Sequence, residues 1–193
     1  MNTILQQELK KILNGRFSQS ESTRLNYSRG EDTYDPILSK AVVFPETNEE
    51  VSKILKLCNE HKVPVVPFGT GTSLEGNVVG NDKGITISLE KMNKILSVNT
   101  QDFDCRVQAC VTREQLNDYL REDGVFFPID PGANAAIGGM ASTSASGTMA
   151  VKYGTMKTVI TGLTVVLPNG EIMNTGGRTK KTSAGYNLTN LFV

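Results

Sequence analysis

The 193-residue sequence predicts an α+β fold of two subdomains, one built on a small parallel βαβ unit and one on a mainly antiparallel sheet flanked by helices. The first observation behind this prediction is a strand–helix–strand pattern over 41–67. The second is the alternation of apolar and polar residues in 104–110, and the third is an Asn-Gly turn between two apolar runs in 161–173.

The N-terminal part begins with an amphipathic pattern. Leu5, Leu9 and Ile12 recur at helical spacing, which predicts a helix over 3–13 that packs across the body of the protein. The polar segment 24–36 is expected to be a loop or a short helix that ends at its proline. We therefore expect a helical arm over 1–36, a first subdomain over 37–99 and a second subdomain over 100–193.

The first subdomain is expected to contain parallel strands. Residues 41–44 and 63–67 are short β-branched runs, and the segment between them opens with the capping-box pattern Thr47-Asn-Glu-Glu50. Apolar residues then follow at helical spacing, so we expect a helix over 48–60 and a right-handed βαβ unit. Further strands are expected over 84–89 and 94–98.

The second subdomain is expected to begin with a strand over 104–110. A second capping-box pattern, Thr112-Arg-Glu-Gln115, predicts a helix whose inner face is Leu116, Tyr119 and Leu120. Gly124 is placed to end that helix in the left-handed conformation. The Asn-Gly turn in 161–173 predicts a β-hairpin.

Composition excludes several classes of function. Lysine plus arginine and aspartate plus glutamate number 20 each, so no net charge attracts nucleic acid. Three cysteines without Cys-x-x-Cys spacing argue against a disulfide framework or a zinc site and fit a reducing, cytoplasmic compartment. The only histidine, His61, ends the 48–60 helix, where it serves the helix dipole more often than catalysis, and no metal site is expected. No signal peptide or membrane-length apolar run is visible.

Two glycine-rich segments remain as candidate binding sites. The first, 67–77, follows a buried strand and mixes glycines with hydroxyl groups; the residues alone fit either a phosphate-binding loop or a surface turn. It lacks the Gly-Lys-Ser/Thr of a P-loop and the helix that follows a Rossmann fingerprint. In the second, 133–150, all but four of 18 residues are Ala, Gly, Ser or Thr, which permits close backbone approach to a long, flat ligand.

Five motifs in the chain resemble the FAD-binding (PCMH-type) domain of the vanillyl-alcohol-oxidase flavoprotein family. Within that family the resemblance points to the group that contains flavin-dependent D-lactate dehydrogenase (cytochrome) and the glycolate oxidase D-subunit. It runs from about residue 41 to the end of the chain. The motifs lie at 67–76, 127–132, 137–147, 151–154 and 184–193.

The resemblance implies an FAD site with two walls. The first would wrap the pyrophosphate through Phe68, Gly69, Thr70, Gly71, Thr72, Ser73, Gly76 and Asn77. The second would contact the ribityl, phosphate and ring portions through Pro131, Gly132, Ile137, Gly138, Met140, Ala141, Ser144, Gly147, Tyr153 and Gly154. Ile137 and Met140 fit the hydrophobic core equally well. Thr72 stands where some relatives carry a flavin-linking histidine, so we expect FAD to be held non-covalently.

The resemblance also implies a reaction, in which a hydride passes from the α-carbon of a small 2-hydroxy acid to flavin N5 and electrons pass on to a quinone or cytochrome. It implies that the chain is an N-terminal fragment, inactive alone, with the catalytic residues in an absent substrate domain and with peripheral membrane association open for the full-length enzyme. Two alternatives stay open: a same-fold flavin oxidoreductase of the UDP-sugar reductase type, and a non-catalytic nucleotide-binding module.

Overall fold

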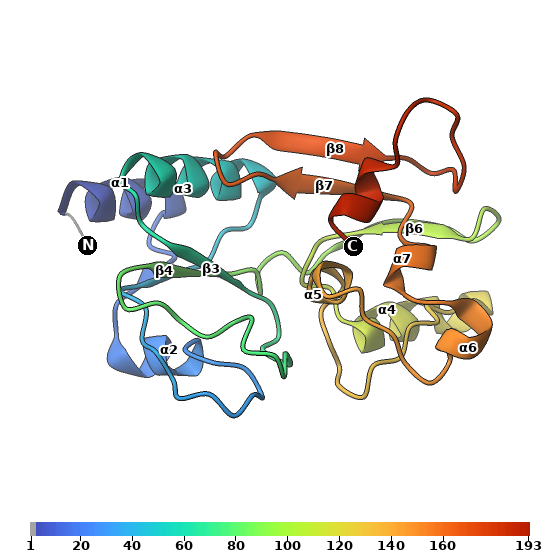
Figure 1. The fold of residues 1–193 in the computed structure, drawn as a ribbon, viewed down its shortest axis with the longest axis horizontal. Helices are drawn as coiled ribbons and strands as arrows, with labels where there is room; N and C mark the ends of the chain where they lie inside the picture. The colour runs from blue at the N-terminus through green and yellow to red at the C-terminus, as the bar shows by residue number, and fades with distance from the viewer. Residues whose placement is uncertain (1–2) are drawn as a thin grey trace. The chain divides into compact units, whose positions relative to one another are not determined.

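The computed structural model describes residues 3–193 and divides the chain into two compact units. Unit 1 contains the residues up to Met92 together with Val166–Ile172, and unit 2 contains Asn93–Val165 and Met173–Val193. The division falls between Met92 and Asn93, whereas the sequence placed it between Asn99 and Thr100. Helices and strands occur in both units, so the predicted α+β class is confirmed (Figure 1).

Unit 1 is a four-stranded sheet in the order β1-β2-β4-β3, covered by helices on both faces (Figure 1). β1 pairs antiparallel with β2, while β4 pairs parallel with both β2 and β3. The elements are α1 (Thr3–Leu13), β1 (Phe17–Ser18), α2 (Glu21–Asn26), β2 (Val42–Val43), α3 (Asn48–Glu60), β3 (Val65–Phe68) and β4 (Ile85–Ser88).

The predicted βαβ unit is present, and a further strand, β4, is inserted between its two strands. α3 connects β2 to β3, and these strands run parallel. β1 was missed and the short helix α2 begins before the expected 24–36 segment, because such short elements carry too little periodicity to be read.

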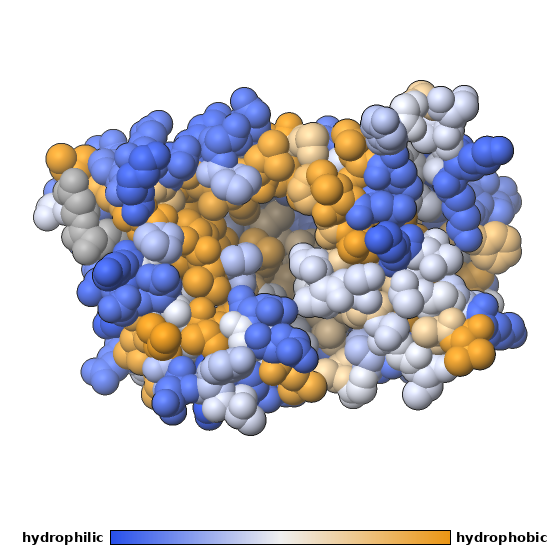
Figure 2. Space-filling view, viewed as in Figure 1, coloured by the Kyte–Doolittle hydropathy of each residue, from blue (hydrophilic) through white to orange (hydrophobic). Residues whose placement is uncertain are grey.

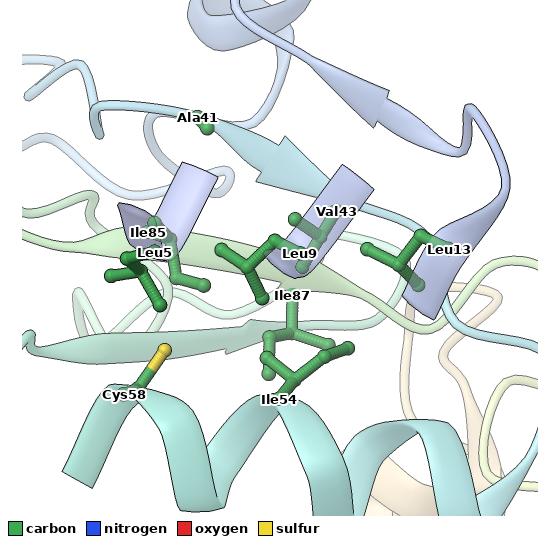
Figure 3. Packing of buried hydrophobic residues seen from close by; sticks show 9 residues of the cluster. All are labelled: Leu5, Leu9, Leu13, Ala41, Val43, Ile54, Cys58, Ile85 and Ile87. Carbon is green, nitrogen blue, oxygen red and sulfur yellow. The ribbon is translucent and has the colours of Figure 1, made fainter. Parts of the chain in front are cut away.

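The core of unit 1 lies between the sheet and the helices α1 and α3. Figure 3 shows leucines of α1 and Ile54 and Cys58 of α3 meeting Ile85 and Ile87 of β4. Leu5, Leu9 and Leu13 of α1 are fully buried, and the partly buried Ile12 packs against the same cluster, so Leu13 joins the three residues predicted for the apolar face. Burial raises the pKa of the Cys58 thiol to about 12, which keeps that side chain protonated and unreactive.

A bidentate ion pair joins the turn after α1 to the first turn of α3. The guanidinium of Arg16 donates to both carboxylate oxygens of Glu50, at 2.8 and 2.5 Å, and also to the carbonyl of Phe44. The hydrogen bond from Arg16 holds the pKa of Glu50 below its ordinary value. Glu50 also accepts from the N–H of Glu46, so only the Thr47 half of the predicted capping box forms.

Unit 2 contains two separate two-stranded sheets and a group of short helices. Its elements are β5 (Ile95–Asn99), β6 (Asp104–Val107), α4 (Arg113–Leu120), the 3₁₀ helix η1 (Arg121–Asp123), α5 (Ile137–Ser142), α6 (Ala150–Tyr153), α7 (Met156–Val159), β7 (Gly162–Val166), β8 (Ile172–Gly176) and the 3₁₀ helix η2 (Leu188–Leu191). β5 pairs antiparallel with β6, and β7 with β8 forms the predicted hairpin.

Details of α4 differ from the sequence prediction. Thr112 caps the helix by accepting from the N–H of Gln115, but the Gln115 side chain donates to the carbonyl of Asn93 instead of closing a capping box. Leu116 and Leu120 are buried, whereas Tyr119 is 60% exposed and does not belong to the inner face. Gly124 has a φ of 70° and ends the η1 helix in the left-handed conformation, as predicted.

No helix in the described residues is long and apolar enough to cross a membrane. Within the same 3–193 range, histidine, cysteine and acidic side chains form no cluster that could hold a metal ion.

The Arg16–Glu50 pair gives a stability prediction. We expect Glu50→Gln to lower the free energy of unfolding by about 1–3 kcal/mol, because it removes a charge-assisted acceptor from a partly buried guanidinium. Urea denaturation measures the loss. Since the pKa of Glu50 is lowered in the folded state, its contribution is complete above the ordinary value of about 4.3 and fades as pH falls below it.

Glu49→Gln is the matched control, because Glu49 lies one residue away in the same helix turn and is exposed. The control should stay within about 0.5 kcal/mol of the wild type. Equal losses in both variants at neutral pH would contradict a stabilising role for the ion pair.

Candidate functional site

The glycine loop, defined as residues 67–77, leaves the carboxyl end of β3. The carbonyl of Phe68 still accepts a hydrogen bond from Leu89 N–H at 2.9 Å, and after that the chain turns sharply. Gly71 and Gly76 have φ values of 75° and 72°, which strain residues with a Cβ atom. A Cβ on Gly71 would also lie 2.8 Å from the Phe68 ring. The backbone conformation alone therefore favours glycine at both positions.

Several backbone donors of the glycine loop have no acceptor in the chain. In the part that the structure describes, the N–H groups of Gly71, Thr72 and Ser73 donate no hydrogen bond. These three residues are only half-exposed, and the hydroxyls of Thr70 and Thr72 lie 3.4 Å apart beside them. Half-buried donors need an acceptor from a ligand or from water, and successive N–H groups around a glycine suit an anion.

The small-residue segment, defined as residues 133–150, contains α5 and the turn that follows it. Figure 2 shows the surface of this region as pale, neither strongly polar nor apolar, because its exposed residues are mainly serine, threonine and glycine. The side chains of Ile137, Met140 and Ala141 point into the core of unit 2. Only the backbone of these three residues is left for a ligand, which favours the core interpretation of Ile137 and Met140.

The glycines of this segment, together with Gly132 just before it, fall into two kinds. A Cβ on Gly138 would lie 2.8 Å from the Ala109 carbonyl, and a Cβ on Gly147 would strike the backbone of Asp130. Packing within unit 2 therefore explains both. Gly132 and Gly139 are exposed, and a Cβ there would meet nothing within 4 Å. Gly139 was not among the expected site residues; its place beside Gly138 in a Gly-Gly pair was the available signal.

The start of α5 offers few donors. Ile137 N–H donates to the carbonyl of Val111 and Gly138 N–H to that of Ala109, both at 2.8 Å. These bonds anchor α5 to the segment before α4. Any contact between α5 and a phosphate would therefore depend on Gly139, whose N–H has no acceptor among residues 3–193.

Asp130 stabilises the turn after α5 through hydrogen bonds. Its carboxylate accepts from the Thr148 hydroxyl at 2.6 Å and from the Met149 N–H at 2.9 Å. These hydrogen bonds, that from Thr148 foremost, hold the pKa of Asp130 below its ordinary value. Asp130 thus brings Pro131 and the turn around Gly147 together.

The last expected site residues lie within this turn and after it. Ser144 adopts a φ of 47°, an uncommon conformation for a residue with a Cβ atom. The ring of Tyr153 stands edge-on to Phe126, with centroids 5.6 Å apart, and Gly154 has a φ of 83° against Thr158. Tyr153 is therefore positioned by its neighbours in unit 2, and its contact with a flavin stays a prediction.

Of the eighteen expected residues, eight lie in the glycine loop of unit 1 and ten lie within 131–154 of unit 2. Sequence reasoning missed Asp130 and a group from the N-terminal arm, Gly30, Glu31 and Tyr34, which touches the glycine loop. No short-range pattern joins those arm residues to a loop so far along the chain.

Parallel strands that lead into a glycine loop with free backbone donors indicate a domain of the nucleotide-binding class, because such donors suit a phosphate group. The chain belongs to the family described as FAD binding domain, which matches residues 39–176. The family expected from the motifs is confirmed, and FAD is the cofactor of this domain.

Relatives of known name support this membership. The chain is 48% identical over 179 residues to "Probable D-lactate dehydrogenase, mitochondrial" of Danio rerio, covering 91% of this chain and 36% of the relative. It is 42% identical to "D-lactate dehydrogenase (cytochrome), mitochondrial" of Arabidopsis thaliana, covering 96% and 33%. It is 36% identical to "Glycolate oxidase subunit GlcD" of Bacillus subtilis, covering 92% and 38%. The chain thus spans about a third of the length of these relatives.

Solved structures agree on the fold. p-Cresol methylhydroxylase matches with a TM-score of 0.81 at 25% identity, over 98% of this chain and 40% of that protein. Alkyldihydroxyacetonephosphate synthase matches with a TM-score of 0.87 at 21% identity, over 100% of this chain and 37% of that protein; at this identity the likeness shows the fold alone.

The Asp130 contacts give a second prediction. Asp130→Ala should speed amide hydrogen exchange at 147–150, because Met149 N–H loses its acceptor and Thr148 its partner. Mass spectrometry of peptides measures the change. Because the pKa of Asp130 is lowered, the wild type should lose this protection only as pH falls below the ordinary aspartate value of about 3.9.

Asp123→Ala is the control, since Asp123 is exposed on η1 in the same unit. Its exchange at 147–150 should match the wild type. Unchanged exchange in Asp130→Ala would show that the carboxylate does not hold the turn.

Proposed function

We propose that this chain is the FAD-binding portion of a flavin-dependent 2-hydroxy-acid dehydrogenase of the D-lactate or glycolate type. The structural observation that carries the proposal is the run of half-buried backbone N–H groups without acceptors at Gly71, Thr72 and Ser73. The substrate class rests on the relatives, which are named as D-lactate dehydrogenases and a glycolate oxidase subunit.

The glycine loop has the groups needed for a pyrophosphate. Its N–H dipoles would neutralise phosphate oxygens, and the hydroxyls of Thr70 and Thr72 would add donors beside them. The absence of side chains at Gly69, Gly71 and Gly76 would let the phosphates approach the backbone.

The small-residue segment and the residues just before it offer backbone groups of their own within unit 2. The bare backbone at Gly132 and Gly139 would allow contact along an extended cofactor, and Asp130 would keep the following turn in shape. When bound, FAD supplies the acceptor for a hydride from the substrate α-carbon. The residues of this chain hold and orient the cofactor; the groups that act on the substrate are proposed to lie outside these 193 residues.

We also propose partners and a location. A small 2-hydroxy acid and a quinone or cytochrome-type electron acceptor would serve the whole enzyme, in keeping with the relatives named as cytochrome-linked. Within residues 3–193 the cysteines Cys58, Cys105 and Cys110 form no disulfide bond, which supports a reducing compartment such as the cytoplasm. The Danio rerio and Arabidopsis thaliana relatives are named as mitochondrial, so we propose a reducing compartment and no particular organelle.

The mode of attachment is testable. We expect the 193-residue chain to take up FAD and to release all of it on denaturation, because Thr72 cannot form a histidyl–flavin bond and the sole histidine caps α3 instead. Absorbance of the filtrate after urea treatment and ultrafiltration measures the released flavin. Flavin retained on the denatured chain would contradict non-covalent binding, and failure to take up FAD would contradict the proposed site.

The catalytic assignment needs the remainder of an enzyme. We expect a chimera, in which this chain replaces the matching part of the 42% identical Arabidopsis thaliana relative, to reduce a dye acceptor with D-lactate or glycolate. The same chimera carrying Gly71→Ala should lose most of that activity, since alanine is strained at a φ of 75°. A chimera that binds FAD yet oxidises neither acid would refute the substrate class while leaving the cofactor site standing.

A further inference from the structure

The glycine loop is supported by residues that lie before the matched family region. That region begins at residue 39, whereas the arm segment, defined as residues 28–35, precedes it. Both lie in unit 1, where the arm segment meets the glycine loop at two places.

The first contact is made by the backbone of Gly30 and Glu31. Glu31 N–H donates to the carbonyl of Gly71 at 3.0 Å. A Cβ on Gly30 would lie 2.6 Å from the Ser73 carbonyl and 2.8 Å from the Gly71 carbonyl. The arm thus engages the carbonyl of Gly71, which belongs to the same peptide unit as the acceptor-free N–H of Thr72, and also contacts the carbonyl of Ser73. Because a peptide unit is planar, fixing the carbonyl of Gly71 fixes the direction of the Thr72 N–H.

The second contact is made by a side chain. The ring of Tyr34 lies where a side chain on Gly76 would be, with ring carbons 2.7 and 2.8 Å from an ideal Cβ. Tyr34 is 56% exposed, so its ring covers the far end of the glycine loop from the solvent side. The two contacts bracket the loop at Gly71 and at Gly76.

The arm segment has its own internal support. The buried carboxylate of Asp32 accepts from the N–H groups of Gly30 and Tyr34, each at 3.0 Å. At its start, the carbonyl of Ser28 accepts from Gly80 N–H at 2.8 Å, just after the glycine loop ends. The Asp32 carboxylate therefore fixes the backbone positions of both contact residues, Gly30 and Tyr34.

From these contacts we propose that the arm segment is a positioning element of the cofactor site: it sets the direction of the unpaired N–H groups of the glycine loop toward the FAD pyrophosphate. The proposal rests on the proposed FAD site. It assigns no contact with the substrate to the arm; Gly30 and Tyr34 act on the cofactor through the loop.

Paired variants of the full 193-residue chain test the proposal. Tyr34→Ala removes the ring and Tyr34→Phe keeps it. Gly30→Ala forces a methyl group against two carbonyls, whereas Gly177→Ala places one where nothing lies within 4 Å. FAD titration by flavin fluorescence, visible circular dichroism of the bound flavin, and cleavage after the exposed Glu75 by a glutamate-specific protease are measured for all four.

We expect Tyr34→Ala and Gly30→Ala to weaken FAD binding by about tenfold or more and to alter the flavin circular dichroism. Cleavage after Glu75 should be faster in both variants without FAD, while Tyr34→Phe and Gly177→Ala match the wild type. Melting of the apo proteins shows whether each variant is folded, and a variant that fails to fold is replaced by Asp32→Ser.

Wild-type affinity and an unchanged flavin spectrum in Tyr34→Ala and Gly30→Ala would overturn the proposal. If the wild type itself takes up no FAD, the proposed function fails, and the cleavage assay then decides separately whether the arm segment holds the loop.

Discussion

A loop that presents unpaired backbone N–H groups cannot stabilise itself with the hydrogen bonds that hold helices and strands. Each free donor is a cost in the absence of an acceptor, and each glycine adds a loss of chain entropy on folding. The shape of the glycine loop must therefore come from its neighbours. In unit 1 those neighbours are the Phe68 ring under Gly71, the Glu31 N–H on the Gly71 carbonyl and the Tyr34 ring over Gly76.

In unit 2 the small-residue segment is also held in shape by neighbouring residues. There the carboxylate of Asp130 holds the turn at Thr148 and Met149, and α5 is anchored through donors of its first turn. Gly138 and Gly147 are small because protein atoms fill the space beside them. Small residues in such a segment thus serve two purposes, and only those whose missing Cβ faces open space, such as Gly132 and Gly139, bear directly on a ligand.

Local signals in the sequence were sufficient for elements whose causes are local. The helix Asn48–Glu60 was predicted to the residue because Thr47 caps it and its apolar face repeats regularly. The reciprocal half of its capping box failed because Arg16, distant in sequence, competes for Glu50. The two segments of the site were predicted because their glycine-rich composition is a local signal. Asp130 and the arm hold those segments in shape through contacts between residues that are far apart along the chain, so no short motif indicates their role.

β4 shows why the N-terminal arm belongs to the fold. Its side chains alternate between two buried faces, with Ile85 and Ile87 against α1 and α3, and Thr86 and Ser88 on the other side. Thr86 is fully buried, and its hydroxyl forms a 2.8 Å hydrogen bond with that of Ser39, which follows the arm. A buried hydroxyl without a partner is costly, as is an exposed apolar face. Since α1 covers the face that carries Ile85 and Ile87, the sheet that presents the glycine loop depends on a helix that precedes the family region.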